Sequence, residues 1–315
     1  MKILVTGGAG FIGSALVNRL VLDEHDVSYV DNYSLSDTRL QRARVDALCQ
    51  GAKEYVADIT DLASLEEIFK EGKFDAVFNL AAKPGVRESI TNPFVYAKTN
   101  YDGLLNIFEL GRRYGVPHII SASSSSVYGR NNTAPYQEDT NVDFPVSVYA
   151  STKRAGELLA YTYTDLHKMN ITCLRFFTVY GPFGRPDMAP FIFTQKISNN
   201  EPIQVFNHGK QQRDFTFVTD IVDGCVRVLE HKNGYQIFNL GNDNPIELMD
   251  FIGVIERAVG KEAQKEFCDA QLGDVTLTHA NIDRARTVLG FNPKVSIESG
   301  IEQFVSWYKE FYTVS

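Results

Sequence analysis

A glycine-rich turn close to the start of the chain constrains the fold more than any other feature. The residues TGGAGFIG at positions 6–13 follow an apolar run and lead into an amphipathic stretch. Without a side chain, Gly7 can take a tight turn, Gly10 lets the backbone approach a diphosphate, and Gly13 lets the helix pack closely against the strand. The N-terminus of that helix attracts the anion. The turn therefore predicts a strand, turn and helix that together bind a dinucleotide.

Short β-rich runs alternate with helical stretches over the first 120 residues. This alternation is typical of parallel strands joined by crossover helices, so we expect an α/β fold with a doubly wound parallel sheet, the Rossmann architecture. The expected strands are residues 2–6, 27–31, 54–57, 76–80, 118–121 and 171–177, and the expected helices are residues 14–22, 62–69 and 93–114.

The pattern changes after residue 177, where TVYGPFGRPDMAPFIF is rich in turn formers and aromatics. We expect the chain to leave the sheet there and build a smaller α/β lobe. A helix at 220–230 and a strand at 236–240 would return to the sheet, and two helical stretches would fill the tail at 244–315. The two lobes are therefore expected to be interleaved, with residues 1–177 and about 211–240 in one, and about 178–210 and 241–315 in the other.

The charge balance, 31 Lys and Arg against 39 Asp and Glu, argues against a basic surface for nucleic acid or an anionic membrane. The sequence contains no run of about 18 uncharged apolar residues, so we expect no membrane span. Gly7 interrupts the first apolar stretch too early for a signal peptide. We expect a cytoplasmic protein. The four cysteines lie far apart, without the paired spacing typical of a metal site or a disulfide framework.

Asp31 ends the second expected strand, 18 residues beyond Gly13. A carboxylate at this place would accept hydrogen bonds from the adenosine ribose hydroxyls. No Arg or Lys stands beside it in VDNY, which favours NAD over NADP; an ordinary turn at Asp31-Asn32 is the alternative. Asp58 follows the third expected strand, where it could face the adenine or cap the next helix.

Tyr149 and Lys153 stand four residues apart at the head of a helix expected to begin near residues 145–147. That spacing places both side chains on one helical face, about 6 Å apart along the axis. The ammonium and a nicotinamide cation would lower the pKa of the phenol by about three units, roughly 4 kcal/mol. Such a pair also arises by chance, so its position matters: it follows the serine run 123–126 at the end of the fifth strand, where ligands bind. A polar loop with a surface Tyr and Lys is the alternative.

Taken together, these motifs resemble the extended short-chain dehydrogenase/reductase family. The resemblance rests on TGGAGFIG, Asp31, NLAA at 79–82, the serines before Val127-Tyr128-Gly129, and YASTK at 149–153. Within the family, residues 174–189 and 211–222 are similar to the NAD-dependent UDP-sugar 4-epimerases, and most closely to UDP-glucuronate 4-epimerases. The match runs from residue 2 to about residue 291. It implies a UDP-sugar substrate and a tightly bound NAD that is recycled in each turnover.

The resemblance implies a role for each catalytic residue. Tyr149 is the base that removes the C4 hydroxyl proton while hydride passes from C4 to NAD, Lys153 lowers the Tyr149 pKa and holds the nicotinamide ribose, and Ser124 shares the hydroxyl's hydrogen bond. The 4-keto sugar then turns over and hydride returns to its other face, which inverts C4. The implied NAD-binding residues are Gly7, Gly10, Phe11, Ile12, Gly13, Asp31, Asn32, Asp58, Ile59, Leu80, Ala81, Ala82, Asn100, Tyr149 and Lys153.

The resemblance also implies the contacts of the UDP-sugar. Arg213 matches the diphosphate-binding arginine of the family, although it could instead pair with Asp214 on the surface. Asp274 fits a ribose contact, and the family often has Arg where Gln271 stands. Gln204 and Phe206 fit the uridine pocket. The implied substrate-binding residues are Arg87, Ser124, Ser125, Ser126, Thr178, Arg185, Gln204, Phe206, Arg213 and Asp274, with no metal ligand among them.

Small hydroxyl side chains bear on the choice of sugar. Ser125 and Ser126 stand where related dehydratases and decarboxylases carry carboxylates, so simple epimerisation is favoured. With Thr178, they could hold a C6 carboxylate to which Arg185 adds charge, and this favours UDP-glucuronate or UDP-galacturonate. Thr278 is small enough to admit an N-acetyl group, so UDP-N-acetylglucosamine stays open, as does UDP-glucose.

Other function classes and the oligomeric state stay open at this point. The same fold serves non-catalytic NAD-sensing proteins and net oxidoreductases that exchange their cofactor. Sensing proteins generally lose the Tyr or the Lys, and this chain keeps both. The resemblance implies that the first lobe binds NAD and the second the UDP-sugar. It also implies a homodimer in which the helices at 93–114 and 149–167 form a four-helix bundle, although the aromatic-rich stretch LLAYTYTDL is equally typical of a core.

Overall fold

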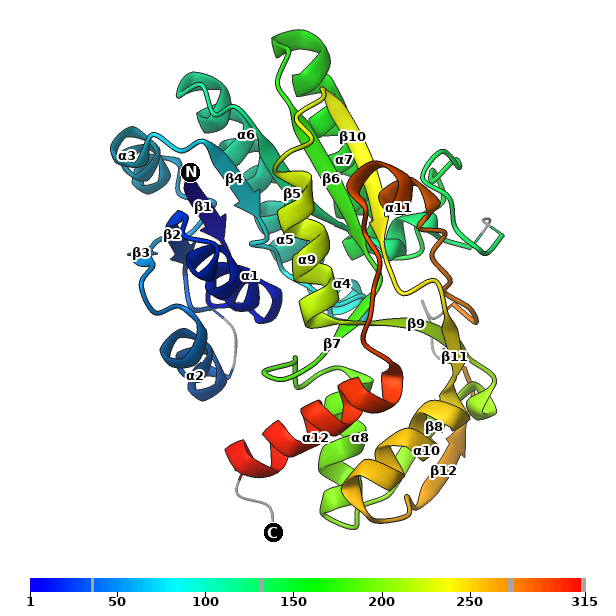
Figure 1. Cartoon of the computed structure of the whole chain (residues 1–315). Coiled ribbons are helices and arrows are strands. Elements are labelled where there is room, and N and C mark those ends of the chain that lie inside the picture. Colours follow the sequence, from blue (N-terminus) through cyan, green and yellow to red (C-terminus); the bar gives the residue numbers. More distant parts are fainter. Residues whose placement is uncertain (35–36, 131–132, 271–274, 313–315) are drawn as a thin grey trace.

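The computed structural model describes residues 1–34, 37–130, 133–270 and 275–312. Its centre is a seven-stranded sheet in the order β10-β6-β5-β4-β1-β2-β3, in which all neighbours run parallel. Figure 1 shows this sheet with helices on both faces and a smaller part of the molecule beside it. The chain order reverses between β1 and β4, and sheets of this kind bind ligands beyond the carboxyl ends of the strands at such a point. The expected doubly wound α/β fold is confirmed.

The strands of the large sheet agree with the expected ones to within a few residues. Helices bury both faces of the strands near the centre, and β4 and β6 are buried at every position, including their polar residues. The seven strands are β1 (Lys2–Thr6), β2 (Asp26–Asp31), β3 (Lys53–Val56), β4 (Ala76–Asn79), β5 (Ile119–Ser124), β6 (Ile171–Phe176) and β10 (Tyr235–Leu240).

Alternate side chains of β1 face two separate cores. Ile3 and Val5 pack into the core under one set of helices, whereas Leu4 packs into the core on the other face. The first set is α1 (Phe11–Leu22) and α9 (Val218–Val228), with α2 (Thr38–Leu48) beside α1, and the second comprises α3 (Leu62–Gly72), α6 (Gly103–Arg113) and α7 (Val148–His167). The expected helices at 14–22, 62–69 and 220–230 are all present, each with slightly different bounds.

The helix expected at 93–114 is interrupted. The structure has α5 (Pro93–Ala97), a single π-helical turn at Lys98–Asp102, and then α6, after a short α4 (Glu88–Thr91). Asn100 lies in the π turn and is buried, and its side-chain amide bonds the backbone of Lys83 and the hydroxyl of Thr152. Inserted turns of this kind gather at functional sites, and apolar spacing alone does not reveal them.

The smaller lobe contains two short sheets. One joins β11 (Pro245–Glu247), β9 (Gln212–Phe217) and β7 (Thr178–Tyr180), and the other pairs β12 (Lys265–Cys268) with β8 (Ile203–Phe206). Helices α8 (Ala189–Ser198), α10 (Leu248–Val259) and α12 (Ile297–Tyr312) pack against one another beside them. Figure 1 shows this lobe beyond the carboxyl ends of the large sheet. The division of the chain into an NAD-binding domain and a UDP-sugar-binding lobe stays a prediction.

The tail was expected to hold two helical stretches, and this expectation was wrong. Between residues 244 and 312 the described part of the chain forms three helices, because α11 (Asp283–Leu289) lies between α10 and α12. Its seven residues, DRARTVL, are mostly polar and too few to give a clear helical period. This short helix packs on α9 and β10 rather than on the small sheets.

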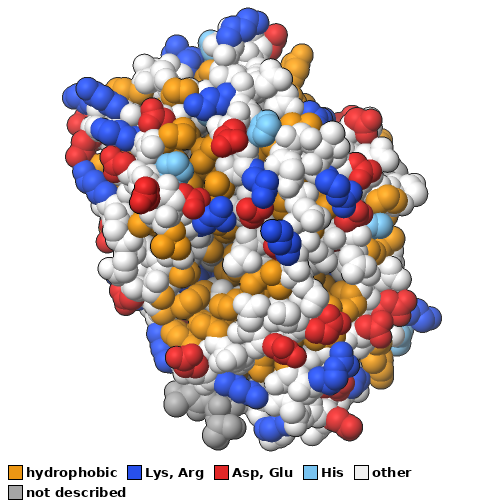
Figure 2. Space-filling model, viewed as in Figure 1, with side chains coloured by type: hydrophobic (Ala, Val, Ile, Leu, Met, Phe, Trp, Pro, Cys, Tyr) orange, Lys and Arg blue, Asp and Glu red, His pale blue; other side chains and the backbone are white. Residues whose placement is uncertain are grey.

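The surface is mixed in character. Figure 2 shows basic and acidic side chains interspersed over one face of the molecule, with apolar side chains gathered around its hollowed middle. Among the described residues, none of the helices combines the length and apolar character needed to cross a bilayer.

Candidate active site

The glycine turn between β1 and α1 leaves no room for side chains. Gly7 has a φ of +71°, its N–H donates to Val30 O at 2.8 Å, and a Cβ atom on it would lie 2.8 Å from Ala81 N. A Cβ on Gly10 would lie 2.9 Å from Gly7 O, and one on Gly13 only 2.0 Å from the same oxygen. All three glycines are therefore required for the turn, as inferred for Gly7 and Gly13, whereas the approach of a diphosphate to Gly10 stays a prediction.

The N-terminus of α1 fits an anionic diphosphate. Gly10 is its N-cap and provides no side-chain cap, and the described first turn holds no acidic residue. The first N–H groups and the positive end of the helix dipole are thus available to a phosphate. Phe11 is buried in the core and Ile12 half-buried beside it, so both anchor this end of the helix.

Asp31 is tied to the glycine turn by its own carboxylate. One oxygen accepts from Ala9 N at 3.1 Å and the other from Tyr33 N at 2.9 Å. Burial raises the pKa of Asp31, and these N–H groups together with the Arg44 guanidinium oppose that rise. The carboxylate lies at the carboxyl end of β2, where its expected role of binding the adenosine ribose requires it.

Asn32 and Asp58 meet at the ends of β2 and β3. The Asn32 amide donates to Asp58 at 2.7 Å, and Asp58 also accepts from Thr60 N at 2.8 Å. The alternative that Asp58 caps the next helix is wrong, because Asp61 is the N-cap of α3. The side chain of Ile59, another expected cofactor contact, is buried in the core, where a Cβ on Gly103 would strike it.

The loop after β4 runs alongside the glycine turn. Leu80 N donates to Thr6 O at 3.2 Å and Ala81 N to the Thr6 hydroxyl at 3.1 Å, and Ala82 follows them. Asn100 holds the next residue through Lys83 N at 2.7 Å. Four of the expected cofactor contacts therefore lie on or against the loop beside the glycine turn: Leu80, Ala81, Ala82 and Asn100.

Tyr149, Lys153 and Ser124 come together at the carboxyl end of β5. Ser147 caps α7 through Ala150 N at 3.1 Å, which starts the helix just before Tyr149. Lys153 Nζ donates to Ala122 O at 2.8 Å and lies 5.9 Å from the centre of the Tyr149 ring, and the Ser124 hydroxyl is near enough to Tyr149 to lower its pKa. The alternative of a surface Tyr and Lys is wrong.

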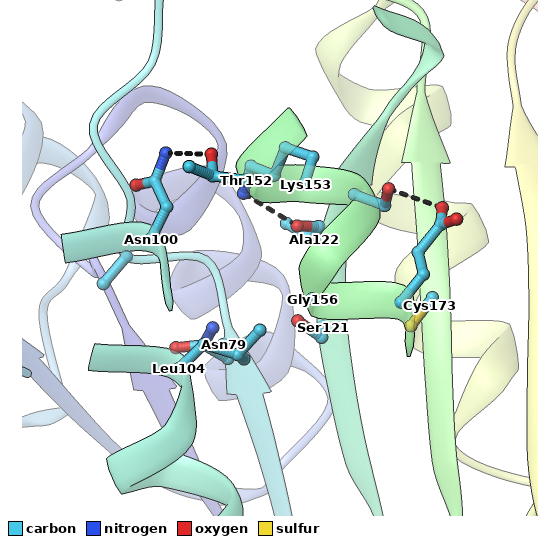
Figure 3. A pocket seen from close by; sticks show the side chains of 12 residues that line it. Asn79, Asn100, Leu104, Ser121, Ala122, Thr152, Lys153, Gly156 and Cys173 are labelled. Carbon is cyan, nitrogen blue, oxygen red and sulfur yellow. Dashed lines mark hydrogen bonds between the residues drawn. The ribbon is translucent and has the colours of Figure 1, made fainter. Parts of the chain in front are cut away.

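A small polar cavity lies behind Lys153 (Figure 3). It is enclosed by residues from β4, β5, β6, the π turn, α6 and α7, and Figure 3 shows the Lys153 ammonium directed at Ala122 O above it. The lining residues are Asn79, Ala81, Asn100, Leu104, Ser121, Ala122, Ser123, Thr152, Lys153, Gly156, Glu157 and Cys173.

The pKa of Tyr149 departs from expectation. Burial raises it above the ordinary phenol value, and the hydrogen bond from Ser124 and the charge of Arg185 only partly oppose this. The expected net lowering of the Tyr149 pKa by Lys153 is therefore not produced by the protein groups alone, because removal from water outweighs them. Burial lowers the Lys153 pKa to about 8, against the opposing effects of Cys173 and Glu157.

Two of the expected sugar contacts, Ser124 and Arg185, lie near enough to Tyr149 to influence its pKa. Ser124 caps a short 3-10 helix, Ser125–Tyr128, and its hydroxyl lies 3.0 Å from that of Ser126. Thr178 begins β7 and is half-buried. Arg185 is near enough to influence the Tyr149 pKa, and its guanidinium donates to both carboxylate oxygens of Asp187.

Arg87 and Phe206 link the two parts of the molecule. The Arg87 guanidinium carbon lies 5.4 Å from the centre of the Phe206 ring, which joins the loop after β4 to β8 of the smaller lobe. Gln204, two residues earlier on β8, is exposed. Arg87 and Phe206, two of the expected substrate contacts, are thus brought together.

Arg213 lies on β9 and does not pair with Asp214. Its guanidinium donates to Gln211 Oε1 at 3.0 Å and to Gln212 O at 2.9 Å. Asp214 is fully buried and accepts from backbone N–H groups around residues 242 and 280, so the surface ion pair considered above is wrong. Thr278 is also buried, and its hydroxyl accepts from Asp214 N at 3.2 Å. Asp274 and Gln271 lie outside the described residues.

Three further side chains shape the site without any motif that marks them in the sequence. Tyr96 packs edge-on against Tyr149 with ring centres 6.3 Å apart. Arg44 of α2 is buried and donates twice to Phe183 O, at 2.9 and 3.0 Å, so it fixes the loop that carries Arg185. Glu157 lies beside Lys153, and only its four-residue spacing from that lysine could have indicated it.

The chain is similar to named proteins over nearly all its length. The model of the NAD dependent epimerase/dehydratase family matches residues 3–241. A UDP-glucuronate 4-epimerase of Thermodesulfobacterium geofontis is 42% identical, over 98% of this chain and 96% of that protein.

Solved structures agree with this match. The UDP-glucuronic acid 4-epimerase of Bacillus cereus, in complex with UDP-glucuronic acid and NAD, gives a TM-score of 0.92 at 34% identity, over 99% of this chain and 100% of that one. A UDP-glucose 4-epimerase of Thermotoga maritima with UDP-glucose gives a TM-score of 0.92 at 30% identity, with the same coverage. The chain therefore belongs to the NAD-dependent epimerase/dehydratase family, as its motifs predicted.

Proposed function

We propose that this protein is an NAD-dependent UDP-sugar 4-epimerase, an isomerase that interconverts UDP-glucuronate and UDP-galacturonate through a transient 4-keto sugar. The observation that carries the proposal is the meeting of Tyr149, Lys153 and Ser124 at the cleft edge that also holds the glycine turn. The relative from T. geofontis and the neighbour from B. cereus, whose complex contains UDP-glucuronic acid and NAD, support it.

NAD, when bound, supplies the acceptor and donor of hydride at the sugar C4 atom. The turn at residues 7–13 and the N-terminus of α1 would hold its diphosphate, because both are shaped to admit backbone-to-phosphate contact. Asp31 would hold the adenosine ribose, and Tyr149 and Lys153 the nicotinamide ribose. The steric exclusion of any Cβ from the turn is the structural reason to assign NAD to this edge.

Tyr149 would act as the general base toward the C4 hydroxyl of the sugar. The Ser124 hydroxyl is near enough to the phenol to lower its pKa, so the serine can contact the sugar oxygen beside Tyr149. Burial raises the Tyr149 pKa, so the phenolate requires the positive charges of Lys153 and Arg185 in the same cleft. The proton stays on Tyr149 while the keto sugar turns over, and it returns to the same oxygen, so the reaction consumes no acid or base.

The side chains around the sugar favour a C6 carboxylate. Ser125 and Ser126 offer hydroxyl donors beside Ser124, Thr178 stands at the start of β7, and Arg185 supplies a positive charge near Tyr149. A charged donor set of this kind binds a carboxylate more strongly than a hydroxymethyl group. UDP-glucose is the second candidate, because the T. maritima neighbour is named for it.

The case for UDP-N-acetylglucosamine as the substrate rests on the small size of Thr278. That hydroxyl is buried and accepts a hydrogen bond from Asp214 N, which does not bear on the size of the side chain, so UDP-N-acetylglucosamine stays an alternative substrate. The cytoplasmic location and the division into an NAD-binding and a UDP-sugar-binding lobe stay predictions.

We propose that the protein forms a homodimer through α4, α5 and α7. Ile90, Phe94, Leu158, Tyr161 and Leu166 lie on these helices, which pack against one another, and between 50% and 85% of each side chain is exposed. Exposed apolar clusters on a folded domain mark protein interfaces. A second copy of the same face would bury them in a bundle of helices.

A panel of UDP-sugars tests the function. We expect the purified protein to convert UDP-glucuronate to an equilibrium mixture with UDP-galacturonate, to carry NAD through purification, and to release no reduced cofactor. Production of reduced NAD in proportion to product would identify a net oxidoreductase instead. Failure to convert any sugar of the panel, with NAD still bound, would identify an NAD-sensing protein.

A further inference from the structure

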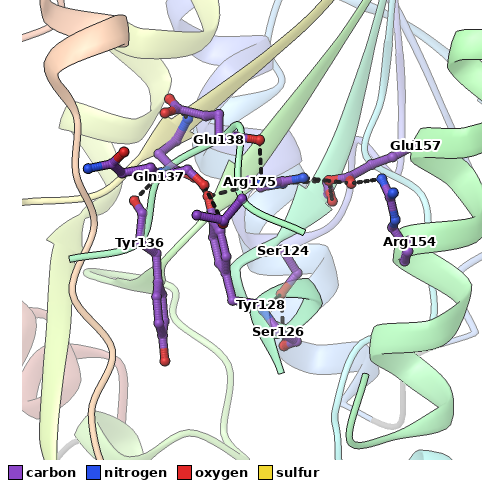
Figure 4. Close-up of polar contacts among 12 residues, drawn as sticks. Ser124, Ser126, Tyr128, Tyr136, Gln137, Glu138, Arg154, Glu157 and Arg175 are labelled. Carbon is purple, nitrogen blue, oxygen red and sulfur yellow. Dashed lines mark hydrogen bonds and ion pairs between the residues drawn. The ribbon is translucent and has the colours of Figure 1, made fainter. Parts of the chain in front are cut away.

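A buried carboxylate lies one helical turn beyond Lys153. Glu157 of α7 is 1% exposed, and its carboxylate accepts hydrogen bonds from side chains of two strands. The Ser123 hydroxyl donates at 2.7 Å, and Arg175 Nε and Nη2 donate at 2.8 and 2.9 Å. Arg154 adds a contact of 3.3 Å from its own helix. Figure 4 shows Glu157 between Arg175 and Arg154.

The contacts of Glu157 belong to a regular set between β5 and α7. Consecutive residues of β5 face successive turns of the helix: Ala122 O accepts from Lys153, Ser123 donates to Glu157, and Ser124 is near enough to Tyr149 to lower its pKa. Ser123 and Arg175 are also register partners on β5 and β6, so they leave the sheet side by side. Glu157 therefore fastens α7 to both strands one helical turn beyond Lys153, and its contact on β5, Ser123, directly follows the Ala122 contact of Lys153.

Arg175 is itself immobilised. Its side chain is 1% exposed, its Nη1 donates to the Tyr128 hydroxyl at 3.0 Å and to Glu138 O at 3.3 Å, and the Tyr128 ring lies beneath it at 4.8 Å. Tyr128 in turn donates to Asn239 of β10 at 2.7 Å. The anchor of Glu157 thus extends over β5, β6 and β10.

Stability alone does not account for this ion pair. Buried ion pairs are often replaced by well-packed apolar residues without loss of stability, because removing two charges from water costs about as much as their attraction returns. What the pair adds is geometry, since a carboxylate held by an arginine fork permits little rotation of the helix that carries it.

We propose that Glu157 is a positioning residue: held by Ser123 and Arg175, its carboxylate fixes α7 so that Lys153 stays on Ala122 O and Tyr149, one turn earlier, stays beside the end of β5. The inference rests on the proposed function, because it gives Glu157 a part in placing the base and its ammonium. It assigns no contact between Glu157 and substrate or cofactor.

The charge of Glu157 has a second effect on Lys153. Burial lowers the Lys153 pKa to about 8, and Cys173 and Glu157 raise it. Among the residues that line the cavity behind Lys153, these two are the only other titratable groups, and Tyr149 faces the ammonium from one turn earlier on α7. Removing the carboxylate therefore lowers the Lys153 pKa further, and the ammonium deprotonates at a lower pH.

The test compares the wild-type protein with Glu157→Gln, which keeps the shape but loses the charge and one acceptor. We expect kcat to fall about 10- to 100-fold, because displacement of catalytic groups by about 1 Å has effects of that size, while KM for the UDP-sugar changes less than about twofold. The alkaline limb of the kcat profile moves to lower pH. In crystals of the variant, Lys153 Nζ moves out of hydrogen-bond range of Ala122 O, a readout that does not depend on activity.

Two further variants separate positioning from folding. Glu157→Gln/Arg175→Met removes the unpaired guanidinium, so it folds even where the single variant does not, and we expect it to keep the low kcat and the shifted alkaline limb. Glu256→Gln is the matched control, because Glu256 accepts from Lys265 and Ala263 N in the smaller lobe; it should lose stability and keep kcat.

Unchanged kcat, pH profile and Lys153 geometry in both Glu157 variants would overturn the inference. A wild-type protein without epimerase activity would overturn the proposed function instead, and the crystal comparison would still decide whether Glu157 holds Lys153 and Tyr149 in place.

Discussion

Replacement of Gly13 by alanine tests the glycine turn most severely. A Cβ atom there would lie 2.0 Å from Gly7 O, 2.9 Å from Gly7 C and 3.1 Å from Gly8 Cα. All three are backbone atoms, so no side chain can rotate away. Ordinary contact begins near 3.4 Å, and the turn would therefore have to retreat by about 1.4 Å.

This displacement of the turn affects both the stability of the protein and its affinity for NAD. It stretches the bonds from Gly7 N to Val30 O and from Gly10 N to Gly7 O, now 2.8 and 3.0 Å, each of which contributes about 1 kcal/mol. Overpacking itself costs about 1–3 kcal/mol. We expect a loss of about 3 kcal/mol in the free energy of unfolding, which lowers Tm by roughly 5 °C in a chain of this size. We also expect NAD to bind at least tenfold more weakly, a loss of about 1.4 kcal/mol or more in binding free energy.

Calorimetric unfolding and titration with NAD measure the two effects. Gly253→Ala in α10 is the matched control, because its Cβ would meet only Arg257 Nη1, at an ordinary 3.5 Å. That variant should gain up to about 1 kcal/mol from helix propensity and bind NAD normally. A Gly13→Ala protein with wild-type Tm and wild-type NAD affinity would refute the steric reasoning.

Three further changes have clear expected outcomes. Tyr149→Phe removes the proposed base, so turnover measured with UDP-glucuronate should fall by about 10²–10⁴-fold while UDP binding persists; near-normal turnover would exclude Tyr149 as the base. Phe94→Glu places a charge on a side chain that is 85% exposed on the proposed interface, and sedimentation should report monomers; an unchanged dimer would exclude that face. Burial raises the Asp214 pKa from 3.8 to about 6, so ionisation of this carboxyl weakens the folded state. As pH rises from about 4 to about 6, the Tm of the wild type should therefore fall relative to the Tm of Asp214→Asn. A difference in Tm between the two proteins that does not change with pH would contradict this.

Local sequence patterns were sufficient to predict the strands of the large sheet. β1 occupies the expected residues 2–6, and the other strands differ only at their ends, because most of them begin as short β-rich runs that turn formers or helical stretches separate. The steric need for glycine at positions 7, 10 and 13 was also readable, since it follows from one turn and its two neighbouring elements. The same holds for Tyr149 and Lys153, whose four-residue spacing fixes a common helical face.

Contacts between distant segments could not be read from the chain. Arg44 looks like a solvated residue of a surface helix, yet it is buried against Phe183, 139 residues away. The π turn at Asn100 depends on Thr152, and the pairing of Glu157 depends on Arg175. The raised pKa of Tyr149 is likewise a property of burial, which a motif does not report.

The fate of the hydrogen on C4 tests the central claim most directly. UDP-glucuronate with deuterium at C4 would be incubated with the protein in ordinary water containing unlabelled free NAD, and the product examined by mass spectrometry and NMR. If hydride leaves C4 and returns to it within one active site, UDP-galacturonate keeps deuterium at C4 and free NAD stays unlabelled. Product with protium at C4, or deuterium in the free cofactor, would contradict the account.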